Sequence, residues 1–188
     1  IVPIGLTGGV TRRGLVTRLR REGERFAVDL DDGTTVRARK LLVATGARDH
    51  LPDIPLLAQR WGIDVVHCPY CHGWEVRDQP LGVLGGSSEA VRYAQIVCQW
   101  SDDVVYFIFS QLLTSAERSE LVARAIGVVE GDVSRIVVDD DHLSAVELAD
   151  GRSIPRRVFF VPPRFVAHHD LLVGLGCGLD ANGWLAVD

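Results

Sequence analysis

Apolar and polar residues alternate along the first part of the chain in the way that half-buried β-strands require. The alternation runs over residues 15–20 and again over residues 25–30. The dipeptide Asp32–Gly33 is a strong hairpin signal, and a third strand is expected over residues 35–43. Three short strands in series predict an antiparallel β-meander. It ends at Ala44–Thr45–Gly46, where glycine lets the backbone pass close to another group.

The pattern then changes to strands that alternate with helices. Prolines between Leu51 and Pro55 mark a linker ahead of this region. Short apolar runs predict buried strands, and longer stretches with apolar residues on one face predict helices. The expected elements are a short extended piece over residues 64–67, a strand over 81–84, a glycine–serine turn over 85–90, a helix over 89–100, a strand over 104–109 and a capped helix over 114–125.

The meander pattern then recurs. The matched segments are 16–19 with 133–136, 27–30 with 145–148, 32–33 with 150–151, and 37–43 with 156–161. The offset is 117 residues from Val16 to Val133 and 118 from Ala27 to Ala145. An internal repeat of this kind predicts a duplicated dinucleotide-binding architecture. We therefore expect an α/β protein with two Rossmann-like three-layer ββα domains.

The two copies of the repeat differ in what precedes them. Residues 81–125 place a strand–turn–helix–strand–helix unit before the second copy, whereas only residues 1–14 precede the first. The chain begins at Ile1 and contains no methionine. We expect a fragment with an incomplete first domain, residues 1–60 and 165–188, and a second domain over residues 61–164.

Composition narrows the classes of function. Of the 188 residues, 47% are hydrophobic and 24% charged, as in an ordinary globular protein. The formal charge of −5 argues against a nucleic-acid partner, because phosphate binding needs a clustered basic surface. The sequence contains no apolar run long enough to cross a membrane and no export signal, so we expect a cytoplasmic location without membrane association.

The sharpest motif is Cys68–Pro69–Tyr70–Cys71–His72. A two-residue spacer holds two sulfurs close enough to form a disulfide with little backbone movement. It also favours a reactive thiolate that can attack another disulfide. Beside a βαβ pattern, this spacing predicts a redox-active dithiol.

These cysteines have other possible uses. A zinc site could draw on His67, Cys68, Cys71 and His72, but no second Cys-x-x-Cys or spaced histidine pair completes it. Cys-x-x-Cys-His is also the attachment motif of c-type haem, but the sequence contains no methionine to serve as an axial ligand. Cys-Pro-Tyr-Cys matches the active site of glutaredoxins, but there the second cysteine enters a long helix, whereas here Gly73 follows almost at once. A pair of ordinary buried cysteines remains open.

The run Cys68-x-x-Cys71-His72-Gly73-Trp74-Glu75, ahead of a strand and a glycine turn, resembles the low-molecular-weight thioredoxin reductases. These are FAD-dependent pyridine nucleotide–disulfide oxidoreductases. The resemblance implies bound FAD near Ala44, Thr45 and Gly46, a homodimer, a flavin-proximal Cys71 and an interchange Cys68. His72 stands where the reductases have an acid, and this is similar to the dithiol oxidases of the superfamily. It could act as an acid/base or be a plain turn residue.

The expected nicotinamide site departs from its fingerprint. Gly85, Gly86, Ser87, Ser88 and Ala90 follow a strand and open a helix, but Ser87 replaces the second glycine. No ribose-binding acid and no arginine cluster follow the strand at 104–109. NADPH binding is therefore doubtful, and the domain could be a retained scaffold.

Together these features predict an FAD-dependent thiol–disulfide oxidoreductase that cycles Cys68 and Cys71, with His72 as acid/base. The direction could be dithiol oxidation with oxygen as acceptor, or NADPH-dependent reduction of thioredoxin. The substrate could be a small-molecule dithiol or disulfide, or a thioredoxin-like protein. A non-catalytic relic or a zinc module is the alternative from another class.

Overall fold

The computed structural model describes residues 2–4, 9–87 and 89–187, and Ser88 lies outside them. The described chain forms two compact units. Unit 1 comprises residues 1–48 and 165–188, and unit 2 comprises residues 49–164. Residues 49–60, which we expected in the first domain, belong to unit 2, because Ile54 and Leu57 are buried in its core.

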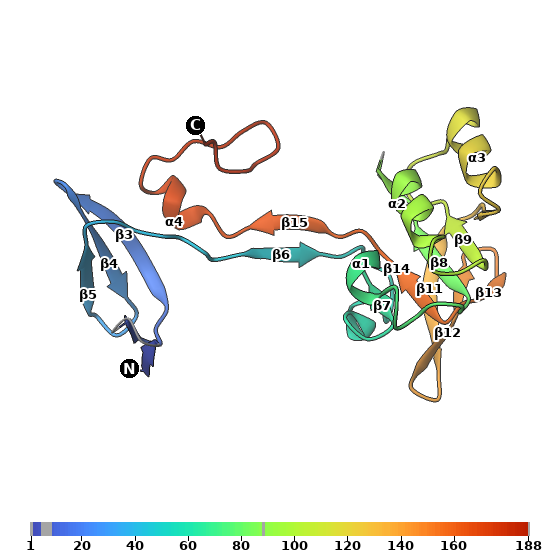
Figure 1. The fold of residues 1–188 in the computed structure, drawn as a ribbon, viewed down its shortest axis with the longest axis horizontal. Helices are drawn as coiled ribbons and strands as arrows, with labels where there is room; N and C mark the ends of the chain where they lie inside the picture. The colour runs from blue at the N-terminus through green and yellow to red at the C-terminus, as the bar shows by residue number, and fades with distance from the viewer. Residues whose placement is uncertain (1, 5–8, 88, 188) are drawn as a thin grey trace. The chain divides into compact units, whose positions relative to one another are not determined.

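Unit 2 is built on a parallel sheet of five strands in the order β10-β9-β8-β14-β7 (Figure 1). The strands are β7 (Val65–Val66), β8 (Leu81–Leu84), β9 (Val104–Phe107), β10 (Gly127–Val129) and β14 (Val158–Phe160). The strand order reverses at β8 and β14, as in doubly wound nucleotide-binding folds. The predicted Rossmann-like α/β class is confirmed.

Two separate clusters of buried side chains cover the two faces of this sheet. Leu81 and Val83 face the helices α2 (Ala90–Val97) and α3 (Ser115–Val122), whose apolar residues include Ala94 and Leu121. A further short helix, α1 (Pro69–His72), follows β7. Leu84 and Phe159 face the other way, toward a second sheet. Alternate residues of a strand point to opposite faces, so these strands must be apolar on both sides.

The second sheet is the meander β11 (Val133–Asp139), β12 (His142–Leu148) and β13 (Ser153–Pro155). The first meander, in unit 1, is β3 (Val16–Glu22), β4 (Arg25–Leu30) and β5 (Thr35–Ala38). The predicted repeat is confirmed in detail, since both meanders are antiparallel and both shift register at equivalent places, Val16/Arg18 and Val133/Arg135.

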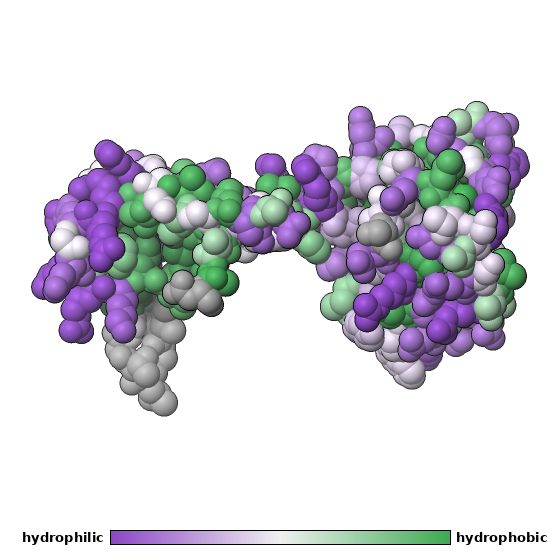
Figure 2. All heavy atoms as spheres, turned by 90° about the horizontal axis from the view of Figure 1, so that it is seen from above, coloured by the Kyte–Doolittle hydropathy of each residue, from purple (hydrophilic) through white to green (hydrophobic). Residues whose placement is uncertain are grey.

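Unit 1 also contains the strands β1 (Val2–Ile4) and β2 (Gly9–Thr11) and the helix α4 (Asp170–Val173). Its described residues include only two buried hydrophobic side chains, Leu19 and Ala27. Figure 2 shows hydrophobic surface on this unit beside its charged side, and the exposed apolar residues there include Leu15, Leu42 and Val173. The first meander therefore packs little apolar surface within the described chain.

Some predicted boundaries were wrong. The third strand of the first meander ends at Ala38, and residues 41–43 are not a strand, because no described strand pairs with them.

Two extended segments, β6 (Ala47–His50) and β15 (Arg164–Ala167), pair with each other where the chain passes between the units (Figure 1). The short 3-10 helix Ala58–Arg60 leads into unit 2. No helix in the described ranges is long and apolar enough to cross a membrane.

Candidate redox site

The dithiol motif begins in the turn after β7 and continues through the short helix α1. Cys68 has extended backbone angles (φ −97°, ψ 107°) and is the N-cap of α1, and Pro69 takes the first helical position. Proline is favoured there because its fixed φ suits a helix and its missing N–H needs no partner. The glycine that follows the helix has a packing cause, since the indole of Trp100 fills the space of a side chain at Gly73.

Cys68 and Cys71 form a disulfide, with their Cα atoms 5.2 Å apart. The backbone N–H of Cys71 donates a hydrogen bond to Cys68 Sγ at 3.2 Å. Cys71 is exposed and Cys68 half-buried. A backbone N–H aimed at a sulfur stabilises its thiolate once the disulfide is reduced. The turn is therefore built to favour a nucleophilic Cys68.

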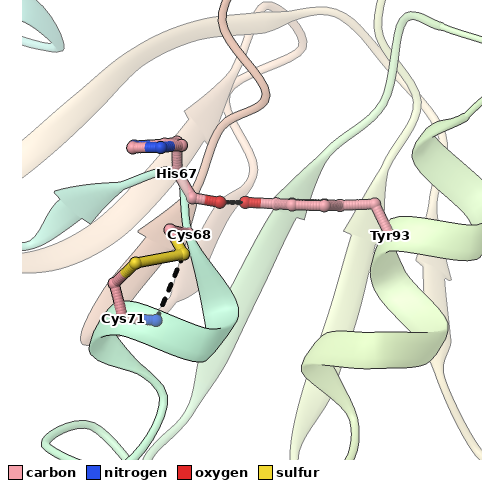
Figure 3. Close-up of a disulfide and its surroundings, with 4 residues drawn as sticks. All are labelled: His67, Cys68, Cys71 and Tyr93. Carbon is pink, nitrogen blue, oxygen red and sulfur yellow. Dashed lines mark hydrogen bonds between the residues drawn. A yellow bond between two sulfur atoms is a disulfide. The ribbon is translucent and has the colours of Figure 1, made fainter.

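Two histidines flank the pair. His72 is the last residue of α1, half-buried, and forms no side-chain hydrogen bond that the described residues reveal. His67 is also half-buried, and its ring stacks on Trp61 with 5.8 Å between ring centroids. In Figure 3 the His67 imidazole lies apart from the disulfide.

A tyrosine that the sequence analysis did not single out contacts this turn. The hydroxyl of Tyr93, in the first turn of α2, donates a hydrogen bond to the main-chain carbonyl of His67 (Figure 3). Its ring packs edge-on against Phe160, 6.4 Å away between centroids. Burial raises the pKa of Tyr93 well above its usual range. No motif signals this contact, because its partner is a backbone atom distant in sequence.

The glycine turn follows the central strand β8. A side chain at Gly85 would meet the Tyr106 hydroxyl 2.6 Å away, and one at Gly86 (φ +110°) would meet the Phe109 carbonyl oxygen at 2.9 Å. The packing of the chain itself therefore demands both glycines. They would be needed with or without a bound nucleotide.

The remaining fingerprint residues are less favourable for a nucleotide. Ser87 is exposed, whereas Ala90, the first residue of α2, is fully buried in the core and is available only for packing. The N-cap of α2 is Glu89, whose side chain makes no capping hydrogen bond. A carboxylate at this position opposes an anionic ligand, because the helix N-terminus otherwise attracts negative charge.

A cavity of about 450 Å³ nevertheless lies beside the glycine turn. Gly85, Gly86 and Ser87 line it, together with Ser110 after β9 and two basic residues, His50 and Arg164. Arg164 forms no ion pair with another described residue. The sequence analysis missed both basic residues, because they lie on the extended segments β6 and β15 rather than after β9. Neither cysteine of the pair is in this lining.

The segment expected to contact FAD lies in unit 1. Ala44, Thr45 and Gly46 are all exposed, and Gly46 has a left-handed φ of +67° with no heavy atom near the position of a Cβ. Thr45 Oγ1 donates to the His168 carbonyl at 2.9 Å. Thr45 also borders a cavity of about 450 Å³ with Gly14. Ligand sites measure about 300–1,000 Å³, so the cavity beside Thr45 has the size of a ligand site.

The structure offers little to the zinc interpretation of the cysteines. Within residues 2–4, 9–87 and 89–187, no three histidine, cysteine or acidic side chains gather closely enough to hold a metal ion. The other two cysteines are free: Cys98, the C-cap of α2, is half-buried, and Cys177 in unit 1 is exposed.

Comparisons with known proteins bear on the whole chain. The family model for pyridine nucleotide-disulphide oxidoreductases matches residues 7–188. The crystal structure of HlmI is 52% identical with a TM-score of 0.88, and the match covers 94% of this chain and 57% of that one. For the putative thioredoxin reductase TrxB from Bacillus anthracis the identity is 28% and the TM-score 0.84, over 93% of this chain and 59% of that one.

A curated relative agrees with these structures. The thioredoxin reductase sirT of Leptosphaeria maculans is 26% identical over 172 residues, which are 84% of this chain and 53% of that protein. The chain thus spans little more than half the length of the proteins it resembles.

Proposed function

Since this chain belongs to the pyridine nucleotide-disulphide oxidoreductase family, we propose that its protein is an FAD-dependent thiol–disulfide oxidoreductase working through Cys68 and Cys71. The observation that carries the proposal is the turn between β7 and α1, where a backbone N–H is aimed at Cys68 Sγ beside an exposed Cys71. We further propose that it oxidises a small-molecule dithiol, with oxygen as the final acceptor.

The exchange follows from the geometry of the pair. A substrate thiolate attacks Cys68 Sγ and breaks the disulfide, which leaves the electron pair on Cys71 Sγ. The second substrate thiolate then attacks the substrate sulfur of the mixed disulfide and expels the Cys68 thiolate. The Cys71 N–H stabilises that leaving group. Two electrons pass from the substrate to the cysteine pair, and the substrate closes its own disulfide.

The role of proton donor and acceptor in this exchange is assigned to His72. It follows Cys71 directly in α1, and an imidazole exchanges protons near neutral pH. In this role it protonates the Cys71 thiolate when the disulfide opens. FAD, which Ala44, Thr45 and Gly46 would contact, supplies the two-electron acceptor when bound, and the overall reaction reduces oxygen to hydrogen peroxide with the two substrate protons.

The oxidase direction is supported by the glycine turn. Ser87 stands in place of a glycine, Glu89 places a carboxylate at the helix N-terminus, and packing alone accounts for Gly85 and Gly86. After β9 the chain continues as Phe109–Ser110–Gln111, which offers neither an acid for a ribose nor an arginine for a phosphate. These features weaken the case for electron entry from NADPH.

The decisive experiment uses the full-length protein, anaerobic and saturated with FAD. The absorbance band of the oxidised flavin is followed during addition of dithiothreitol and, separately, of NADPH. The proposal expects bleaching by dithiothreitol alone, loss of this bleaching in Cys68→Ser, and peroxide formation when air is admitted. The variant Cys177→Ser, which removes an exposed cysteine outside the pair, should bleach normally. Bleaching by NADPH would overturn the oxidase direction.

A second candidate is an NADPH-dependent reductase of thioredoxin-like proteins. The cavity beside the glycine turn favours it, because Arg164 brings a positive charge that offsets Asp53 at the carboxyl ends of β8 and β14, where nucleotides bind in such folds. If NADPH bleaches the flavin, Arg164→Ala should raise the KM for NADPH about tenfold, the usual order for one lost charged contact. Unchanged kinetics would remove Arg164 from the site.

The homodimer and the cytoplasmic location are part of the same proposal. The support for the location is chemical, because the proposed dithiol substrate stays reduced in the cytosol, where thiols are kept reduced. The dimer rests on the resemblance to the reductases.

A further inference from the structure

The peptide unit between His67 and Cys68 is held from outside its own turn. The carbonyl that it presents belongs to His67, and the hydroxyl of Tyr93 donates a hydrogen bond to this oxygen. Tyr93 lies 26 residues further along the chain, on α2, the helix that follows the glycine turn. Figure 3 shows the phenol reaching across from α2 to the carbonyl while the disulfide lies below it.

This carbonyl bears directly on the orientation of Cys68. Because a peptide unit is planar, fixing the His67 carbonyl also fixes the plane that contains the Cys68 nitrogen. Cys68 then takes the extended N-cap conformation that brings its Sγ to 3.2 Å from the Cys71 nitrogen. Rotation of the plane would carry the sulfur away from this N–H.

The side chain of His67 is held as well. Its ring stacks on Trp61 at 5.8 Å, and the Trp61 indole N–H donates to Asp49 Oδ2 at 3.0 Å. His67 is therefore held at its ring by Trp61 and at its carbonyl by Tyr93. The two contacts fix the residue that immediately precedes the reactive cysteine.

We propose that Tyr93 is a positioning residue for the dithiol, which sets the reactivity of Cys68 by holding the His67–Cys68 peptide in place. The inference rests on the proposed thiol–disulfide function and adds to it a residue outside the Cys-x-x-Cys motif. The effect is larger in the reduced protein than in the disulfide, because a thiolate accepts a much stronger hydrogen bond than a disulfide sulfur.

The state of the phenol is consistent with this role. Burial raises the pKa of Tyr93, so the hydroxyl keeps its proton throughout the neutral range and can donate to a carbonyl, which only accepts. The ring is held independently by the edge-on contact with Phe160. Removal of the hydroxyl alone should therefore leave the packing of α2 intact.

The test is Tyr93→Phe in the full-length protein, with Tyr106→Phe as the matched control. Tyr106 belongs to the same core cluster and also carries a buried hydroxyl, but that hydroxyl lies beneath Gly85. Two quantities are measured: the equilibrium of the Cys68–Cys71 pair with glutathione, and the rate at which iodoacetamide modifies Cys68 at neutral pH, identified by peptide mass spectrometry.

Tyr93→Phe should slow alkylation of Cys68 about threefold to tenfold, because less of the thiol is held as a stabilised thiolate. The equilibrium constant for reduction of the pair should fall by a similar factor, tenfold being about 30 mV for this two-electron couple. Tyr106→Phe should match the wild type in both. Equal values in Tyr93→Phe and the wild type would overturn the role of Tyr93.

The outcomes separate this inference from the proposed function. If the wild-type pair does not exchange with glutathione at all, the thiol–disulfide function fails, and the Tyr93 role fails with it. If the wild type exchanges and Tyr93→Phe behaves identically, only the role of Tyr93 fails. Should Tyr93→Phe not fold, 3-fluorotyrosine at position 93 replaces it. This residue keeps the ring and strengthens the donor, so alkylation of Cys68 should become faster.

Discussion

Two strand-to-helix turns flank β14 on the sheet of unit 2, and they differ in what holds them. The dithiol turn leaves β7, an edge strand of two residues, whereas the glycine turn leaves β8, a central strand of four. In the first, the N-cap Cys68 accepts a hydrogen bond from the helix backbone. In the second, the N-cap Glu89 makes none. The shorter edge strand β7 is thus followed by the turn whose helix N-cap makes a hydrogen bond.

A buried tyrosine supports each turn, in opposite senses. Tyr93 donates its hydroxyl proton to the His67 carbonyl, whereas the Tyr106 hydroxyl oxygen accepts a hydrogen bond from the backbone of Gly86. The first contact orients a reactive side chain through its backbone. The second stabilises a tight turn that carries no reactive group. The same strand–turn–helix arrangement therefore positions a reactive group in the dithiol turn and serves packing alone in the glycine turn.

Removal of either sulfur of the dithiol turn should have the largest effect. Cys68→Ser and Cys71→Ser should each lower dithiol turnover by about 10³-fold or more, because each leaves no disulfide to exchange. Steady-state oxidation of dithiothreitol by the flavin-loaded protein measures this. Cys98→Ser changes a cysteine on the helix of the other turn and should keep turnover near wild type. Turnover that survives in both pair variants would make the cysteines structural.

The next prediction concerns what holds the short edge strand. Asp64, just ahead of β7, forms a buried double hydrogen bond with Arg60 at 2.6 and 2.9 Å and accepts the Leu143 N–H at 2.7 Å. Asp64→Asn should lower the free energy of unfolding by about 1–3 kcal/mol, because Arg60 loses one charged partner and keeps only Asp141, at 2.7 Å.

Urea unfolding followed by tryptophan fluorescence measures this loss, since Trp61, Trp74 and Trp100 all lie in unit 2. Asp150→Asn, which disrupts the exposed pair of Asp150 with Arg152, is the control and should barely move the transition. Equal effects of the two substitutions would show that β7 is held by its hydrogen bonds to β14 alone.

The sequence predicted the fold because the signals were local and repeated. The hairpin dipeptides at Asp32–Gly33 and Asp150–Gly151 and the alternation around them located both meanders. The helix cap at Thr114 was also predictable, and the structure contains it as a full capping box with Glu117. The predicted ends of strands were wrong where pairing with a neighbouring strand decides the end, as at residues 41–43.

The candidate site was predictable only where it is contiguous in sequence. The spacing of Cys68 and Cys71 predicts a disulfide, and the structure contains this disulfide. Tyr93 could not be found, because its contact is with a backbone carbonyl and its position on α2 looks like ordinary amphipathic packing. Arg164 was missed because only the folded sheet brings it to the glycine turn.

A smaller difference is expected in the free energy of unfolding when two glycines are each replaced by alanine. Gly86→Ala combines a left-handed φ of +110° with a Cβ 2.9 Å from the Phe109 carbonyl, so it should cost about 2–4 kcal/mol. Gly151→Ala, at φ +88° with open space around it, should cost about 1–2 kcal/mol from backbone strain alone. Urea unfolding of both variants gives the difference. Equal costs would mean that the turn after β9 yields and that the glycine turn is looser than its packing indicates.

The smallest predicted effect concerns the tyrosine beneath the glycine turn. Burial, with the nearby charge of Glu117, raises the pKa of Tyr106 to about 12, against roughly 10 in an unfolded chain. Because the folded-state pKa is the higher one, its contribution to stability is intact below about pH 10 and is lost as the pH rises toward 12. Unfolding in urea at a series of alkaline pH values should therefore give a shallower decline for Tyr106→Phe than for the wild type. Identical slopes would mean that Tyr106 ionises as readily in the folded protein as in the unfolded chain, and its hydroxyl would then be no firm support for the turn.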